Sequence, residues 1–332
     1  MNMKFLFFFL DGVGLGKNDP KSNPFAQAKL PTLERLLGGQ RLLIETLSPP
    51  TNYQPATGQP FTSNNTETKP LALVHDTPQA TLLALDPCLG VPGIPQSATG
   101  QATLLTGINV PSTLGYHYGP KPNRPIAQFL QNGTLFHQLN ESHKRVSLLN
   151  AYPPSYFQAI QRGYRIFSAI PLVTTRAGFA LKTIDDLFTG RALSADFTGS
   201  GWRDRLGISD TPLLTPEQAG ERMAMLAQEA DLTFYEYWLS DYAGHKQDMD
   251  AACYLLETID RVLTGLLATW NLEDGLILIT SDHGNIEDLS TRRHTTNPVP
   301  ALIFGQPDLR QTFTKDLIDL TGITPAILKL FS

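Results

Sequence analysis

Acidic and imidazole side chains gather in residues 281–300, SDHGNIEDLSTRRHTTNPVP. Asp282, His283 and His294 follow the apolar run GLILIT at 275–280, which is short and rich in isoleucine and leucine and therefore predicts a buried strand. Because open α/β sheets bind ligands at the carboxyl ends of their strands, we expect these side chains to emerge together. Mixed oxygen and nitrogen donors suit a divalent metal such as zinc or manganese. A polar turn with two solvated histidines is the alternative for this segment alone.

Two further segments show the same arrangement, an apolar run followed at once by candidate ligands. The run LTFYEYWLS at 232–240 predicts a strand, and Asp241 and His245 follow it in DYAGH. The run KFLFFFL at 4–10 predicts another strand, and it stops at Asp11. A helix-capping aspartate with a surface histidine, or an ordinary turn aspartate, is the alternative for each segment taken singly.

Distant parts of the chain thus supply donors to one edge of a predicted sheet. These donors exceed what one tetrahedral ion takes, so they predict a pair of divalent ions, manganese or zinc. Two metals about 4 Å apart can hold both the attacking and the leaving oxygen of a phosphoryl displacement. The donors are Asp11, Asp241, His245, Asp282, His283 and His294.

A candidate nucleophile lies in PGIPQSATGQATLLTG at 92–107, where Ser97 and Thr99 offer hydroxyls. Small and apolar residues alternate from Ser97 onward and predict a helix, with Pro95 in its entry turn. A hydroxyl there meets backbone N–H groups and the positive end of the helix dipole, which favour a bound phosphate. Coordination to a metal would lower its pKa. The alternative is that Ser97 only caps the helix.

Together and in this order, the motifs resemble the alkaline phosphatase superfamily of metalloenzymes, within it the branch of cofactor-independent phosphoglycerate mutase and phosphopentomutase. The motifs are LDGVG, QSATGQATLLTG, DYAGH, SDHGN and HTTNPVP. The resemblance implies that Ser97 is the nucleophile that carries the phosphoryl group, with Thr99 as the fallback. It also implies one ion held by Asp11, Ser97, Asp282 and His283, and a second held by Asp241, His245 and His294.

The resemblance implies a metal-dependent phosphohydrolase or phosphomutase that acts on a small phosphate ester. A phosphodiesterase or phosphonate hydrolase, and a protein that binds a phosphorylated ligand without turnover, are the alternatives. Only about 140 residues separate Ser97 from Asp241, which leaves no room for the large inserted domain of the mutase. Gln101 also replaces a histidine of the mutase. We therefore expect the shared phosphoryl chemistry rather than phosphoglycerate mutase activity.

Predicted strands alternate with predicted helices over the rest of the chain, which indicates one α/β domain with a mostly parallel sheet flanked by helices. Residues 47–70, rich in Pro, Thr and Asn, predict a long surface loop, and 171–214 predict a small cap insertion. Thr215 and Gln218 have capping-box spacing at the start of a helix. The other predictions are strands at 41–45, 81–85 and 145–150, and helices at 31–37, 135–140, 183–188 and 246–270, the last with His245 at its start.

Composition excludes some classes of function. The 332 residues carry a net charge of −5, so no basic face for nucleic acid is predicted. The two cysteines lie far apart, and no apolar run approaches the 18 or more residues of a membrane span, so we expect a cytoplasmic protein without a membrane partner. Lys121 and Arg124 are candidate substrate contacts, or else belong to a solvated loop. The oligomeric state is not indicated.

Overall fold

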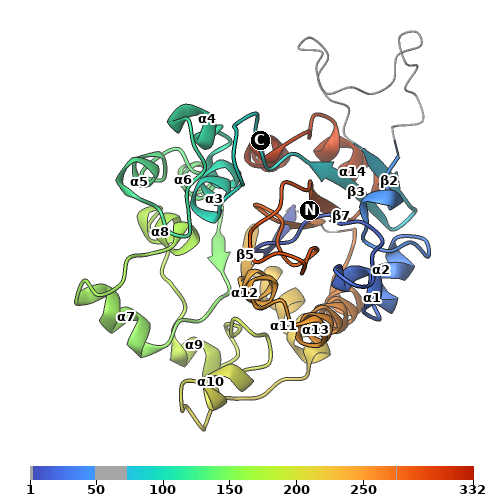
Figure 1. Cartoon of the computed structure of the whole chain (residues 1–332). Coiled ribbons are helices and arrows are strands. Elements are labelled where there is room, and N and C mark those ends of the chain that lie inside the picture. Colours follow the sequence, from blue (N-terminus) through green and yellow to red (C-terminus); the bar gives the residue numbers. More distant parts are fainter. Residues whose placement is uncertain (1–2, 49–72, 274) are drawn as a thin grey trace.

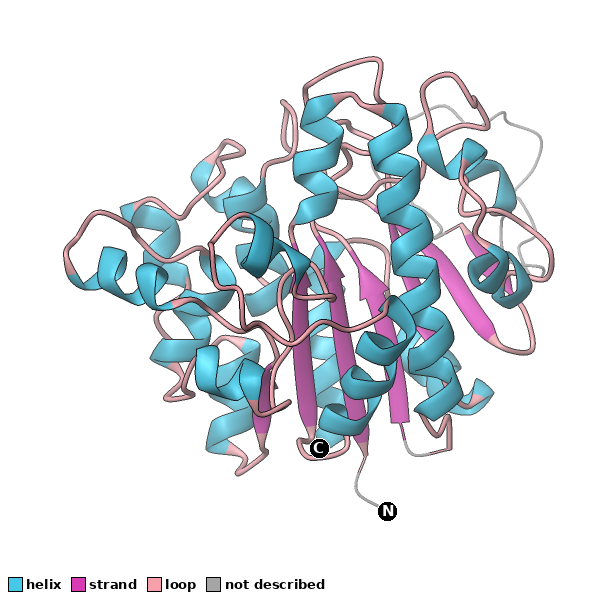
Figure 2. Ribbon diagram, turned by 90° about the horizontal axis from the view of Figure 1, so that it is seen from below, coloured by secondary structure: helices cyan, strands magenta, loops and turns pink. Residues whose placement is uncertain are grey.

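The protein folds around a central sheet with helices on both faces (Figures 1 and 2). The computed structural model describes residues 3–48, 73–273 and 275–332. Within these residues the sheet has seven strands in the order β2-β3-β7-β6-β1-β5-β4. The strands are β1 (Lys4–Leu10), β2 (Val74–Asp76), β3 (Ala80–Leu85), β4 (Val146–Leu148), β5 (Leu232–Tyr237), β6 (Gly275–Thr280) and β7 (Val299–Phe304).

The sheet is mostly but not purely parallel. Strand β1 pairs in parallel with β5 and β6, and β4 pairs in parallel with β5. Strand β7 runs antiparallel to both β6 and β3, and β2 runs antiparallel to β3. The predicted fold class, a mostly parallel α/β sheet flanked by helices, is therefore confirmed. The carboxyl ends of β1, β5 and β6 meet at one edge.

Strand β1 lies in the interior of the sheet, between β6 and β5, and every residue of its sequence KFLFFFL is buried. Alternate side chains of a strand point to opposite faces. Accordingly Leu6, Phe8 and Leu10 pack with one group of helices, and Phe5, Phe7 and Phe9 with another. The first group is α1 (Pro24–Gln27), α2 (Pro31–Leu36), α11 (Pro216–Ala227) and α13 (Met249–Thr269). The second is α3 (Ser97–Thr106), α6 (Leu135–Glu141), α8 (Ala169–Arg176), α14 (Pro307–Thr314) and α15 (Ile323–Phe331).

Shorter elements complete the described chain. Residues 171–214, the predicted cap, contain the end of α8, turns and the two short helices α9 (Ile184–Phe188) and α10 (Ser200–Asp204). Figure 1 shows α9 and α10 at the outer edge of the molecule. That they act as a cap stays a prediction. The loop predicted at 47–70 lies, from residue 49 onward, outside the described residues. The elements are α4 (Val110–Leu114), α5 (Arg124–Phe129), α7 (Pro154–Gln161), α9 (Ile184–Phe188), α10 (Ser200–Asp204), α12 (Leu239–Lys246), η1 (Ile44–Thr46) and η2 (Leu320–Gly322).

The strand predicted at 41–45 is wrong, because this segment leads into the 3-10 helix η1. The N–H of Ile44 donates to Gly16 O at 3.0 Å, and the Thr46 hydroxyl donates to Arg41 O at 2.6 Å. These contacts, one of them to a residue far away in the sequence, use backbone groups that a sheet neighbour would otherwise bind. The other predicted strands and helices are found with boundaries shifted by a few residues, and Thr215 and Gln218 form the predicted capping box.

The prediction that His245 begins the long helix is also wrong. Strand β5 ends at Tyr237, and DYAGH lies in the separate short helix α12. Gln247 ends that helix in the left-handed conformation, with φ of 56°, and the Asp248 side chain then caps α13 by accepting from Ala251 N. Asp241 and His245 therefore lie one turn apart on one face of α12.

None of the described helices is both long and apolar enough to cross a membrane.

Asp231 joins the amino ends of three neighbouring strands. Its carboxylate accepts a hydrogen bond from Arg145 N at 2.8 Å and lies 3.6 Å from Lys4 Nζ. Burial opposes the charge, but the hydrogen bonds from Arg145 outweigh it and hold the pKa of Asp231 below its usual range. A carboxyl group of this kind stabilises the fold above its unfolded pKa and loses that effect as the pH falls through the folded pKa.

We predict that Asp231→Asn lowers the free energy of unfolding at pH 7 by roughly 1–3 kcal/mol, because a charged hydrogen-bond acceptor is lost. The difference from the wild type should shrink below about pH 4, where the native carboxylate itself becomes protonated. Urea unfolding between pH 7 and pH 3 measures both effects, with exposed Asp210→Asn as the control. An equal penalty at both ends of this range would contradict the assignment.

Candidate metal centre

The structure brings all seven predicted ligands together at the carboxyl edge of β1, β5 and β6. Asp11 directly follows β1, Asp282 and His283 follow β6, and His294 lies in the loop that leads to β7. Ser97 is the first residue of α3. Short polar contacts between side chains join these residues into one cluster. Its members are Asp11, Ser97, Asp241, His245, Asp282, His283 and His294. Their role as metal ligands stays a prediction.

His283 is at the centre of this cluster and is completely buried. Its Nε2 lies 3.0 Å from Ser97 Oγ, 3.3 Å from Asp11 Oδ1 and 3.6 Å from Asp282 Oδ2. Ligand atoms of Asp11, Asp282 and His283 all fall within 4.8 Å of one another. This triad, with the hydroxyl beside it, matches the first predicted ligand set.

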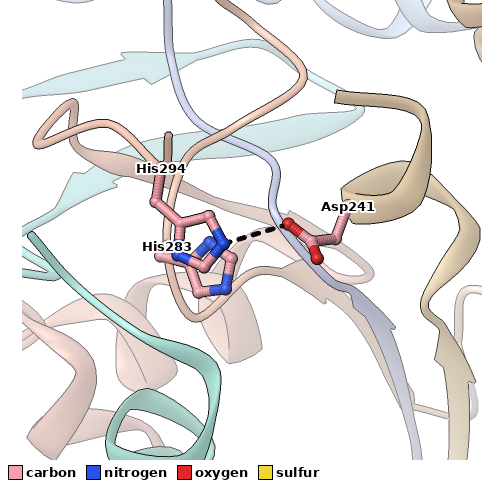
Figure 3. Close-up of side chains that lie close together, drawn as sticks. All are labelled: Asp241, His283 and His294. Carbon is pink, nitrogen blue, oxygen red and sulfur yellow. Dashed lines mark ion pairs between the residues drawn. The ribbon is translucent and has the colours of Figure 1, made fainter. Parts of the chain in front are cut away.

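The second group contains Asp241, His283 and His294, whose ligand atoms also lie within 4.8 Å of one another (Figure 3). Asp241 Oδ1 is 3.4 Å from His294 Nε2, and the His283 and His294 rings stack with centroids 3.7 Å apart. His245 Nε2 lies 3.3 Å from Asp241 Oδ2 and 3.3 Å from His294 Nε2. The two predicted sets are thus adjacent, and His283 reaches both.

Backbone carbonyls orient two of the imidazoles. His245 Nδ1 lies 2.7 Å from Arg292 O, and His294 Nδ1 lies 2.9 Å from Pro95 O. Because a carbonyl oxygen can only accept, each Nδ1 carries the proton, and in the neutral ring the lone pair is then on Nε2. Both Nε2 atoms face the cluster. Metal-binding histidines are commonly held this way.

Without bound cations, the negative charges of these buried carboxylates would be energetically unfavourable. Burial raises the pKa of Asp11 and, more strongly, of Asp282. Burial opposes charge on His283 as well, but the neighbouring Asp282 and Asp11 raise its pKa to about 10. Burial and the charge of His283 lower the pKa of His294 to about 4. Asp11 Oδ1 is buried and accepts no hydrogen bond, although His283 Nε2 lies 3.3 Å away, so its lone pairs remain available to a cation. The donors therefore fit divalent cations.

The structure distinguishes the two candidate hydroxyls. Thr99 Oγ1 is occupied by backbone groups, since it lies 3.1 Å from Gln96 O and accepts from Tyr118 N at 3.2 Å. Ser97 Oγ instead contacts His283 within the cluster. The geometry favours Ser97 as the nucleophile.

Side-chain amides donate hydrogen bonds to the carboxylates of the cluster. Gln101 is buried, and its Nε2 lies 3.2 Å from Asp11 Oδ2 and 3.1 Å from Asp282 Oδ2. Asn285 donates to Asp241 Oδ1 at 2.6 Å and to its backbone oxygen at 3.1 Å. Gln101, at the position where the resemblance implies a histidine in the mutase, links the acids that follow β1 and β6.

Glu287 is a positioning residue that the sequence analysis missed. Its buried carboxylate accepts from Gly14 N at 2.9 Å and Asn285 N at 2.7 Å, and also from Asn297 and the Thr295 hydroxyl. The Glu287 carboxylate therefore connects the loop after β1 to the segments that precede and follow His294 between β6 and β7. Nothing in SDHGNIED marks this glutamate as different from a surface acid.

A cavity of about 480 Å³ opens onto the cluster. The predicted substrate contacts Lys121 and Arg124 are not among its lining residues, whereas Arg293 is. Among the described residues, the guanidinium of Arg293 forms no hydrogen bond or ion pair. The lining residues are Ile94, Gln96, Ser97, Pro120, Asp241, His245, Arg292, Arg293 and His294.

Comparison with known proteins agrees with this geometry. The model of the Metalloenzyme superfamily matches residues 217–332, which include the DYAGH, SDHGN and HTTNPVP motifs. A 2,3-bisphosphoglycerate-independent phosphoglycerate mutase of Agrobacterium fabrum is 33% identical over 109 residues, covering 31% of this chain and 21% of that protein. The chain thus spans about a fifth of the length of this curated relative. The C-terminal third of the chain is thus similar to the metalloenzyme superfamily, which confirms over these residues the resemblance stated from the motifs.

Solved structures align over the whole chain. The PH0037 protein from Pyrococcus horikoshii has a TM-score of 0.56 and 15% identity, with 99% of this chain and 97% of that chain covered. At this identity the likeness shows a shared fold alone. The alkaline phosphatase of the Antarctic bacterium TAB5 has a TM-score of 0.49 and 12% identity, over 98% of this chain and 97% of that chain.

We predict that Glu287→Gln weakens manganese binding roughly 10- to 100-fold, because the amide nitrogen cannot accept the backbone N–H bonds that position the loops. Isothermal titration with MnCl₂ measures the affinity, and exposed Glu229→Gln is the matched control. Unchanged affinity in a folded Glu287→Gln protein would show that this carboxylate does not position the ligands.

Proposed function

We propose that this protein transfers the phosphoryl group of a small phosphate monoester through a phosphoserine on Ser97, with two divalent ions, manganese or zinc, as cofactors. One observation carries the proposal. The Ser97 hydroxyl lies 3.0 Å from His283 Nε2, the side chain that belongs to both triads, and it faces a cavity large enough for a small ester.

The residues present fit two ions. Asp11, Asp282 and His283 with Ser97 would hold one, and Asp241, His245 and His294 would hold the other. Bound there, the ions would supply positive charge that favours the ionised hydroxyl and neutralises the phosphate. The carbonyls of Arg292 and Pro95 keep the Nε2 atoms of His245 and His294 directed at the cluster.

The chain itself positions the nucleophile and the substrate. Ser97 stands at the first turn of the ten-residue helix α3, so the helix dipole favours an anion at its hydroxyl. The guanidinium of Arg293 lines the same cavity and can form paired hydrogen bonds with a phosphate. Gln96, next to Ser97, offers an amide toward the same space.

The reaction has two steps. In the first, Ser97 Oγ bonds to phosphorus while the ester oxygen–phosphorus bond breaks; the serine proton leaves to solvent, and the departing oxygen takes up a proton. In the second step, the oxygen of water, or of another hydroxyl of the same substrate, bonds to phosphorus while the Ser97 Oγ–phosphorus bond breaks. The attacking oxygen loses its proton and Ser97 Oγ takes one up, so that the product is inorganic phosphate or an isomer of the substrate. The first outcome defines a phosphatase and the second a mutase.

Net charge and the state of the cysteines support the proposed kind of ligand and the proposed location. A net charge of −5 supports a small molecule rather than a nucleic acid as the ligand. Two free cysteines, one half-buried and one buried, are consistent with the proposed cytoplasmic location.

We predict that Ser97→Ala abolishes turnover, by at least about 1,000-fold, because the covalent step loses its nucleophile. Phosphate release is followed with manganese-loaded protein on a panel of sugar, nucleotide and glycerate monoesters. Ser112→Ala, an exposed serine of helix α4, serves as the control. Full activity in a metal-loaded Ser97→Ala protein would refute the phosphoserine route.

A further inference from the structure

A second hollow of about 450 Å³ lies beside the metal cavity. Ile94 and Gln96 line both spaces, so the two are adjacent. We call the second hollow the tyrosine subsite, and its lining residues are Pro92, Gly93, Ile94, Gln96, Tyr116, His117, Tyr118 and Gly119. None of these carries a carboxylate or an aliphatic amine.

Two aromatic rings form one side of this subsite. Tyr116 is 41% exposed and Tyr118 is 38% exposed, although both are large and largely apolar. Their ring centroids are 6.4 Å apart at an interplanar angle of 76°, so their faces point in different directions. Rings exposed at a hollow in this way can stack on a planar ligand.

The backbone, and not the rings, holds this loop in place. Thr99 N donates to Tyr118 O at 3.0 Å, and Tyr118 N donates to Thr99 Oγ1 at 3.2 Å. Tyr116 N donates to Pro111 O at 3.2 Å. The loop is thereby fixed to the first turn of α3, two residues from Ser97. The tyrosine side chains remain available to a ligand at a set position relative to the nucleophile.

Gln96 stands between the two spaces. It occupies the N-cap position of α3, but its side chain makes no capping hydrogen bond. Gly119 approaches it closely, since a Cβ there would lie 3.2 Å from Gln96 Oε1 and 3.2 Å from Ser97 N. The amide therefore remains free to hydrogen-bond the linkage between a phosphate and the rest of a substrate.

Charge is consistent with an uncharged occupant. Burial lowers the pKa of His117, so this imidazole is neutral near pH 7. The exposed cations of the neighbouring cavity, Arg292 and Arg293, lie on the metal side. The arrangement separates a place for an anion from a place for a neutral, flat group.

We propose that the tyrosine subsite binds a planar ring in the leaving group, so that the substrates are ring-bearing phosphate monoesters such as nucleoside monophosphates or aryl phosphates. This deepens the proposed function and rests on it. The phosphate lies at Ser97, Gln96 contacts the linkage, and the ring stacks against Tyr116 and Tyr118. The preference arises from the ring and is independent of the phosphoryl chemistry.

The test compares three substrates, AMP, phenyl phosphate and glycerol 3-phosphate, with wild type, Tyr116→Leu and Tyr118→Leu. We expect kcat/KM for the ring-bearing esters to fall roughly 5- to 100-fold, mainly through KM, while glycerol 3-phosphate is unaffected. Tyr118→Trp should keep the preference, and Tyr254→Leu, at a residue 74% exposed on α13, is the control. Loss with AMP alone assigns the subsite to a nucleoside, and loss with phenyl phosphate alone assigns it to a small aryl group.

Equal losses on all three esters, or no loss on any, would overturn the proposal. A binding measurement separates this result from failure of the phosphoserine route. Saturation-transfer NMR with adenosine, which has no phosphate, should show contact with wild type and with Ser97→Ala but a reduced signal with Tyr118→Leu. Undiminished contact in Tyr118→Leu would overturn the subsite even if phosphate release is observed.

Discussion

Mutual repulsion among three aspartates at one edge of the sheet governs how the whole site is arranged. Asp11 and Asp282 are buried, and their charges act on each other and on Asp241. Such a group is stable only with compensating positive charge, since an isolated buried carboxylate is strongly disfavoured. The parallel pairing of β1 with β5 and β6 fixes the three chain segments that carry them. The imidazoles supply part of this positive charge, and the proposed cations would supply the rest.

Close backbone approach makes this geometry possible. A Cβ at Gly100 would lie 2.9 Å from Asp282 Cβ, so only glycine lets the first turn of α3 reach the loop after β6. At Gly12, where φ is +68°, a Cβ would lie 2.7 Å from Asp241 Oδ1. The two glycines thus bring the serine and the three acids within contact distance. The same first turn of α3 anchors the loop of the tyrosine subsite, so the proposed nucleophile and the proposed ring contacts are held by the same turn.

Sequence patterns predict those parts of the site that are local. Each buried strand and the acid that follows it can be recognised from a short stretch, which is why the ligand positions and the sheet were predicted. The boundary after β5 was misplaced because Trp238 and Leu239 extend the apolar run, whereas in the fold they belong to the start of α12. The 41–45 strand failed because Ile44 finds its partner in Gly16, which no local pattern indicates.

Long-range contacts determine what the sequence analysis missed. Glu287 matters through N–H groups of Gly14 and Asn285, and the first of these lies 273 residues away. Lys121 and Arg124 had suitable chemistry, but the structure places Arg293 in the cavity instead. Which exposed cation lines the cavity is set by the paths of loops, and these paths leave no periodic signal.

Anomalous diffraction from crystals grown with MnCl₂ would locate the proposed ions. We expect two manganese peaks, one beside Asp11 and Asp282 and one beside Asp241 and His294, both within reach of the Ser97 hydroxyl. The absence of peaks there at saturating manganese, or peaks only at distant surface acids, would contradict this expectation.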